Sequence, residues 1–97
     1  MYEVQQTSVY KMWFRSLRDR DARGRFDIRI ARLQLGNFGD AKSVGDGVHE
    51  LWMTFGPGYR VYFTRRGEWI ILLLCGGDKG SQSRDIARAK QLASELE

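Results

Sequence analysis

In the first third of the chain, apolar residues recur every three or four positions, which is the spacing of one face of a helix. A helix is therefore predicted over about residues 8 to 18, with an apolar stripe of Val9, Met12, Trp13 and Leu17. Thr7 or Ser8 is expected to cap this helix, because a hydroxyl oxygen accepts a hydrogen bond from a free N–H of the first turn. A second helix is predicted after a break at residues 19 to 21, with a stripe of Phe26, Ile30 and Leu33 that ends before Gly36-Asn37.

Beyond residue 47 the apolar period changes to two, as in strands whose successive side chains point to opposite faces of a sheet. Strands are predicted over residues 48–55, 59–66 and 69–75. Gly56-Pro57-Gly58 is expected to form the first turn, because proline presets φ and the second glycine can adopt a positive φ. Residues 69–75 are apolar throughout, which indicates a central strand paired on both sides. Residues 38–46 are rich in Gly and Asp and are expected to form a loop with room for a short strand.

A short strand over residues 2 to 6 and a last helix after Ser81 or Ser83 complete one α+β domain, residues 1–97, in the order β-α-α-β-β-β-α. The inner face of the last helix is expected to consist of Ile86, Ala89, Ala93 and Leu96. We expect a mostly antiparallel sheet whose helices cover one face and leave the other open. If Leu51, Met53, Val61 and Phe63 face the helices, alternation places on the open face Glu50, Trp52, Arg60 and Tyr62.

The charge balance is basic, with 16 Lys and Arg against 12 Asp and Glu and a net charge of +4. Twelve of those 16 basic residues are arginines, whose guanidinium groups bind phosphate bidentately and stack on bases. One Cys and one His exclude an intramolecular disulfide and a Cys/His zinc site. The longest apolar run is far shorter than the roughly 20 residues of a membrane-spanning helix. We therefore expect a cytoplasmic protein with no cofactor, no metal and no membrane partner.

Glu50 and Arg60 lie on adjacent predicted strands and form the first candidate site. A carboxylate can act as a general base while a guanidinium holds a phosphate, and RNA supplies its own nucleophile in the 2′-hydroxyl. The alternative is an ordinary cross-strand salt bridge. Trp52 and Tyr62 could stack on unpaired bases, or they could pack the sheet or a protein partner.

Lys79 follows the Gly76-Gly77 turn and could protonate a leaving oxygen, although a lysine in a loop is more often simply solvated. A stripe of Arg25, Arg29 and Arg32 on the second helix could follow a nucleic-acid backbone, or it could be a plain charged helix face. His49 alternates with the core set and is isolated from other chemical groups.

Four segments in this order resemble the RelE/ParE toxin superfamily, and in particular its HigB-like addiction module killer proteins. The segments are Gly36-Asn37-Phe38-Gly39-Asp40, Gly45-Asp46-Gly47-Val48-His49-Glu50-Leu51, Gly56-Pro57-Gly58-Tyr59-Arg60-Val61-Tyr62-Phe63 and Leu73-Leu74-Cys75-Gly76-Gly77-Asp78-Lys79, with Gln82 and Asp85-Ile86 after them. The resemblance implies a RelE-like fold and a type II toxin that is neutralised by a cognate antitoxin, commonly a helix-turn-helix protein. RelE-like members cleave mRNA on the ribosome.

Arg60 matches the sheet arginine of the resembled family, and Glu50 and Lys79 match positions within the HigB-like branch. Two departures are Trp52, where relatives often carry a basic residue, and Ile86, where some RelE-like enzymes place a catalytic tyrosine. The resemblance thus favours a ribosome-dependent mRNA endonuclease that inhibits translation, with catalysis by Glu50, Arg60 and Lys79.

In that endonuclease, Glu50 would accept the 2′-hydroxyl proton, and Arg84 or the arginine-rich helices would dock on ribosomal RNA. A ParE-like inhibitor of DNA gyrase without nuclease activity is the alternative, and a relative that retains only antitoxin binding is a third.

Overall fold

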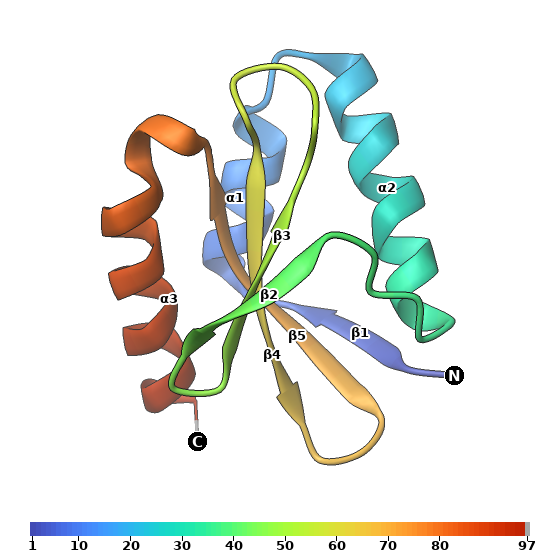
Figure 1. Cartoon of the computed structure of the whole chain (residues 1–97), viewed down its shortest axis with the longest axis vertical. Helices are drawn as coiled ribbons and strands as arrows, with labels where there is room; N and C mark the ends of the chain where they lie inside the picture. Colours follow the sequence, from blue (N-terminus) through green and yellow to red (C-terminus); the bar gives the residue numbers. More distant parts are fainter. Residues whose placement is uncertain (97) are drawn as a thin grey trace.

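The computed structural model describes residues 1–96 and shows one mixed sheet with helices on both sides (Figure 1). The elements are β1 (Glu3–Gln6), α1 (Ser8–Ser16), α2 (Arg20–Gln34), β2 (Ala41–Gly45), β3 (Val48–Trp52), β4 (Arg60–Arg66), β5 (Ile70–Gly77), the short 3-10 helix η1 (Lys79–Ser81) and α3 (Gln82–Glu95). The α+β class is confirmed. The loop expected over residues 38–46 contains a full strand, β2.

The strands lie side by side in the order β1-β5-β4-β3-β2. Strands β2 to β5 form an antiparallel meander, and only β1 is parallel to its neighbour, β5. The apolar strand β5 is paired on both sides, as its composition predicts. The register shifts between Tyr62 and Phe63 of β4, where one extra residue of β5 forms a bulge.

Sequence signals fix the helix ends. The Thr7 side chain accepts a hydrogen bond from the Tyr10 N–H at 3.0 Å, and Asp19 caps α2 by accepting from the Ala22 N–H at 3.1 Å. Gly36 has a φ of +83° just beyond the end of α2, and Gly58 has a φ of +74° in the first predicted turn. Both glycines take the left-handed conformation that other residues avoid.

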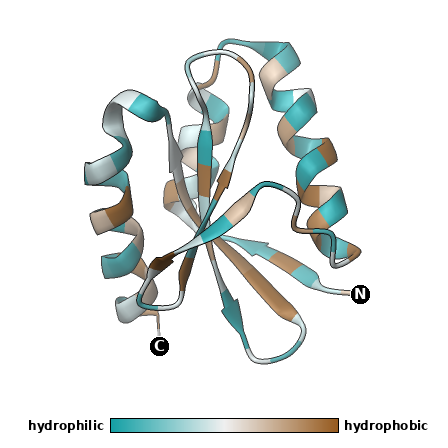
Figure 2. Cartoon of the chain, in the orientation of Figure 1, coloured by the Kyte–Doolittle hydropathy of each residue, from teal (hydrophilic) through white to brown (hydrophobic). Residues whose placement is uncertain are grey.

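Two separate apolar cores lie on the two faces of the sheet. Helices α1 and α2 cover one face, where the buried side chains are Tyr10, Ala22, Phe26, Leu33, Leu51, Met53, Val61, Phe63, Ile71 and Leu73. Helix α3 covers part of the other face, and its core consists of Val48, Tyr62, Leu72, Leu74, Cys75, Ala89 and Ala93. Apolar residues therefore run along the central strands, whereas the helices alternate polar and apolar patches (Figure 2).

The expectation that the helices cover one face only is wrong. The pleat alternation was predicted correctly, since Leu51 and Val61 face α1 and α2 while Glu50 and Tyr62 face the opposite side. Helix α3 packs on that opposite side, because β5 is apolar on both faces and each face requires cover. Within residues 1–96, the structure has no helix long and apolar enough to cross a membrane.

Candidate functional site

A buried carboxylate lies between β3, β4 and the first turn of α3. The Glu50 side chain is 1% exposed, and its Oε2 accepts hydrogen bonds from the Tyr62 hydroxyl at 3.1 Å and the Gln82 amide at 2.8 Å. The Arg60 Nε lies 3.8 Å from the same oxygen, and the Lys42 Nζ lies 3.8 Å from Oε1. We call these five residues the Arg60 cluster. Its carboxylate is compensated by two cations and two neutral donors, as burial of a charge requires.

Arg60 is held at the start of β4 by the turn that precedes it. One of its terminal nitrogens donates to the Gly58 carbonyl, while its Nε is buried and has no hydrogen-bond partner. A methyl group at Gly58 would lie 2.8 Å from the guanidinium of Arg60 and 3.2 Å from the Cβ of Lys79. Gly58 therefore lets two cationic residues approach the same turn. The Lys79 N–H also donates to the Pro57 carbonyl at 3.3 Å.

The expected exposure of Glu50 and Tyr62 is wrong. Tyr62 is completely buried beneath α3, and burial, followed by the Glu50 charge and its hydrogen bond, raises the pKa of the Tyr62 phenol far above its usual range. A buried phenol cannot stack on an RNA base, and a carboxylate closed in by Gln82 cannot reach a 2′-hydroxyl. Glu50 lies beside the Arg60 guanidinium, and Tyr62 donates a hydrogen bond to Glu50.

The solvent-facing border of the cluster is cationic. The Lys42 side chain is 59% exposed, and its ammonium lies 5.9 Å from the ring centroid of the half-buried Trp52. Trp52 is the direct cross-strand partner of Arg60, whose side chain is 15% exposed. Lys79 is exposed beside the same turn. The border can therefore offer positive charge and one aromatic face to an anionic ligand.

Two other predicted site residues lie elsewhere. Arg84 is exposed on α3, about 200° around the helix from Gln82, and so points away from the sheet. His49 stacks on Phe63 with ring centroids 5.3 Å apart, so it belongs with the core side of β3 as its alternation predicts. Neither belongs to the Arg60 cluster.

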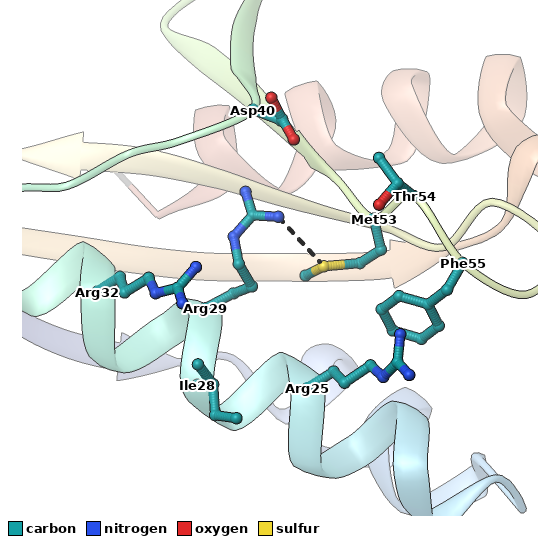
Figure 3. A pocket seen from close by; sticks show the side chains of 8 residues that line it. All are labelled: Arg25, Ile28, Arg29, Arg32, Asp40, Met53, Thr54 and Phe55. Atoms are coloured by element: carbon teal, nitrogen blue, oxygen red, sulfur yellow. Dashed lines mark hydrogen bonds between the residues drawn. The ribbon is translucent and has the colours of Figure 1, made fainter.

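Three of the arginines of α2, Arg25, Arg29 and Arg32, line a groove on the other face of the sheet, opposite the loop between β3 and β4 (Figure 3). The groove has a volume of about 410 Å³ and is also lined by Ile28, Asp40, Met53, Thr54 and Phe55. The Arg25 guanidinium lies 4.5 Å from the ring centroid of Phe55. The Arg29 Nη1 donates to the Trp52 carbonyl at 3.2 Å. We call this feature the α2 groove.

Sequence reasoning found the arginine stripe but missed the opposite wall of the groove. The strand was predicted to run to residue 55, whereas β3 ends at Trp52, so Phe55 lies in the loop; Met53 lies in the core as expected and also lines the groove. The Gly56-Pro57-Gly58 turn was the available signal, because a chain that approaches a turn can leave the pleat and redirect its side chains. Within residues 1–96, no group of three or more His, Cys, Asp or Glu side chains gathers to hold a metal.

Fold and site together define an α+β protein with one mixed sheet, two cores and cationic surfaces on both faces. The chain is 46% identical over 94 residues to a protein of Haemophilus influenzae that is described as uncharacterized, and the alignment covers 97% of this chain and 95% of that relative. The chain belongs to the same family as this Haemophilus protein. No family model matches the chain.

Proposed function

We propose that the protein is the toxin of a type II toxin–antitoxin pair and acts in the cytoplasm as a ribosome-dependent mRNA endonuclease. The observation that carries the proposal is the position of Arg60, which a buried carboxylate and a turn carbonyl hold at the border of a cationic surface. The ordered resemblance to RelE/ParE toxins, which includes the segment around Arg60, also supports it. A cognate helix-turn-helix antitoxin would neutralise the protein.

In this function the chain contributes charge and positioning. Arg60 binds the scissile phosphate and stabilises the negative charge that develops on it, because a fixed guanidinium requires little reorganisation during the reaction. Lys42 and Lys79 bind flanking phosphates. The 2′-hydroxyl of the RNA attacks the phosphorus and passes its proton to solvent, the P–O bond to the 5′-oxygen breaks, and the exposed ammonium of Lys79 donates a proton to that leaving oxygen. Glu50 keeps the guanidinium in place and touches no substrate.

Burial of the carboxylate gives specific support to a second candidate, the ParE-like inhibitor of DNA gyrase. Such an inhibitor binds protein and needs no general base. The only carboxylate of the Arg60 cluster is closed in by Tyr62 and Gln82. A cationic border around a half-buried tryptophan also suits a protein interface, where Trp and Arg often contribute most of the binding energy.

Translation in a purified system, followed by mapping of mRNA 3′ ends, tests the proposal. The wild-type protein should produce ribosome-dependent cuts, and Arg60→Lys should reduce the cleavage rate by about 10²-fold or more, because an ammonium cannot reproduce the fork of a guanidinium. Arg60→Lys retains a cation beside Glu50, so the fold should survive. Arg88→Lys, an equal change at an exposed site on α3, is the matched control.

Uncut mRNA with the wild-type protein would refute the endonuclease. A gyrase supercoiling assay on the same preparations decides between the two candidates, since loss of supercoiling with intact mRNA is the outcome expected of a ParE-like inhibitor. Equal cleavage by wild type and by Arg60→Lys would remove Arg60 from the chemistry.

A further inference from the structure

We propose that the α2 groove is a binding site for single-stranded nucleic acid, in which phosphates lie along the arginines of α2 and a base stacks on the Arg25 guanidinium. The inference deepens the proposed function, because it supplies a second contact through which an RNA would be held. Its geometry is independent of the chemistry at Arg60. The two sites lie on opposite faces of the sheet and meet at Trp52.

The groove carries positive charge that the protein does not neutralise. Within residues 1–96, none of Arg25, Arg29 and Arg32 forms an ion pair, although Asp40 lies at the rim of the same groove. The Nη2 of Arg29 is buried and has no hydrogen-bond partner. Because no carboxylate of the described residues pairs with these three guanidinium groups, an anion in the groove would compensate charge that these residues leave unpaired.

The spacing of the arginines matches a polyanion. Residues 25 to 32 of α2 span about 10.5 Å along the helix axis at a rise of about 1.5 Å per residue. Phosphates of a stacked strand follow one another at about 3.4 Å along its axis, so about three of them fit beside this stretch. Arg25 and Arg32 are exposed at its two ends, and Arg29 is half-buried between them.

Arg25 distinguishes a nucleic acid from an acidic peptide. Its guanidinium carbon lies 4.5 Å from the centroid of the Phe55 ring, so the ring backs the guanidinium from one side, and both side chains line the groove (Figure 3). The other face of a guanidinium held in this way is a platform on which an unpaired base can stack. A peptide carboxylate would pair with the edge of the guanidinium but would not stack on its face.

The test is fluorescence anisotropy with the full chain, without ribosomes, and a labelled hexamer of adenylate as the probe. For single strands the logarithm of the affinity falls with the logarithm of the salt concentration with a slope of about −0.7 for each phosphate contact. The double variant Arg25→Gln/Arg32→Gln should therefore flatten the slope by about 1.4. Arg18→Gln/Arg20→Gln removes the same charge from exposed positions outside the groove and is the matched control.

Arg25→Lys tests the stacking, because it keeps the charge and removes the plane. It should weaken binding of the adenylate hexamer about fivefold or more, and leave binding of an abasic strand of equal length unchanged. Equal slopes for the groove variant and its control would overturn the site. Equal loss for the two strands, or no loss with Arg25→Lys, would overturn the base contact and leave a general polyanion surface.

These outcomes separate the inference from the proposed function. A protein that cuts no mRNA but binds the hexamer through the groove refutes the endonuclease and retains the binding site. A protein that cuts mRNA but binds the hexamer equally well with and without Arg25 and Arg32 refutes the binding site and retains the endonuclease.

Discussion

Replacing Glu50 by alanine removes the one buried acid of the Arg60 cluster, which lies on the face of the sheet that α3 covers. The Tyr62 hydroxyl and the Gln82 amide then lose their acceptor, and a buried polar group left without a partner costs about 1–3 kcal/mol. Arg60 loses its counter-charge as well, and breaking a buried ion pair costs about 3–5 kcal/mol. The loss of the ion pair with the exposed Lys42 adds little to the decrease in the free energy of unfolding.

Because these costs share the same groups, they do not add, and we expect a total loss of about 3–5 kcal/mol. A chain of 97 residues has a free energy of unfolding of about 5–15 kcal/mol, so the variant should be close to the limit of stability. With a slope of about 1–3 kcal/mol per molar urea, the unfolding midpoint should fall by roughly 2 M.

Urea unfolding followed by circular dichroism measures this loss. Glu50→Gln keeps one carbonyl oxygen that can accept from both donors, which share Oε2 in the wild type, and removes the charge, so it should lose less than the alanine variant. Glu68→Ala, on an exposed turn, is the control and should stay within about 0.5 kcal/mol of the wild type. A Glu50→Ala protein within 1 kcal/mol of the wild type would show that the network does not stabilise the fold as we reason.

Three further changes test the packing around the site. Gly24→Ala, on an open stretch of α2, should stabilise the protein by about 0.5–1 kcal/mol in a thermal or urea melt, whereas Gly76→Ala should destabilise it by about 1–3 kcal/mol, because the new methyl group would collide with the Trp13 ring. Thr7→Val should lower the free energy of unfolding by about 1–2 kcal/mol, since its hydroxyl both caps α1 and donates to a β5 carbonyl at 2.6 Å; an unchanged urea midpoint would contradict this. Burial raises the pKa of the Cys75 thiol from 9.0 to about 12, so stability should be full below pH 9 and fall from there toward pH 12, and iodoacetamide should label Cys75 at pH 8 only as fast as the protein unfolds.

The helix starts and the strand alternation followed directly from the sequence. Thr7 caps α1 as predicted, because that signal is local and needs no knowledge of the rest of the fold. The alternation of β3 and β4 correctly placed Leu51 and Glu50 on opposite faces for the same reason. These local patterns depend on side chains only a few residues apart.

The covered face could not be assigned so directly. Strand β5 is apolar on both faces, and Leu72 and Leu74 point to the face opposite α1 and α2. That face also needs to be covered, and the last helix was the element still available to cover it. We assigned that helix to the other face, and this error left Glu50 exposed in our expectation. The facing of Arg25 and Phe55 depends on where α2 sits relative to the β3–β4 loop, and no pattern within either segment encodes it.

The parallel pairing of β1 with β5 sets the order in which the sheet can assemble. The pair joins Glu3 to Ile70, and closing a flexible chain of that length costs roughly 4 kcal/mol of entropy, against about 1 kcal/mol for the tight hairpin that joins β4 and β5. The meander of β2 to β5 can therefore nucleate by itself, and the N-terminal strand should dock after the rate-limiting barrier. Substitutions in β1 should accordingly speed unfolding and leave the folding rate nearly unchanged.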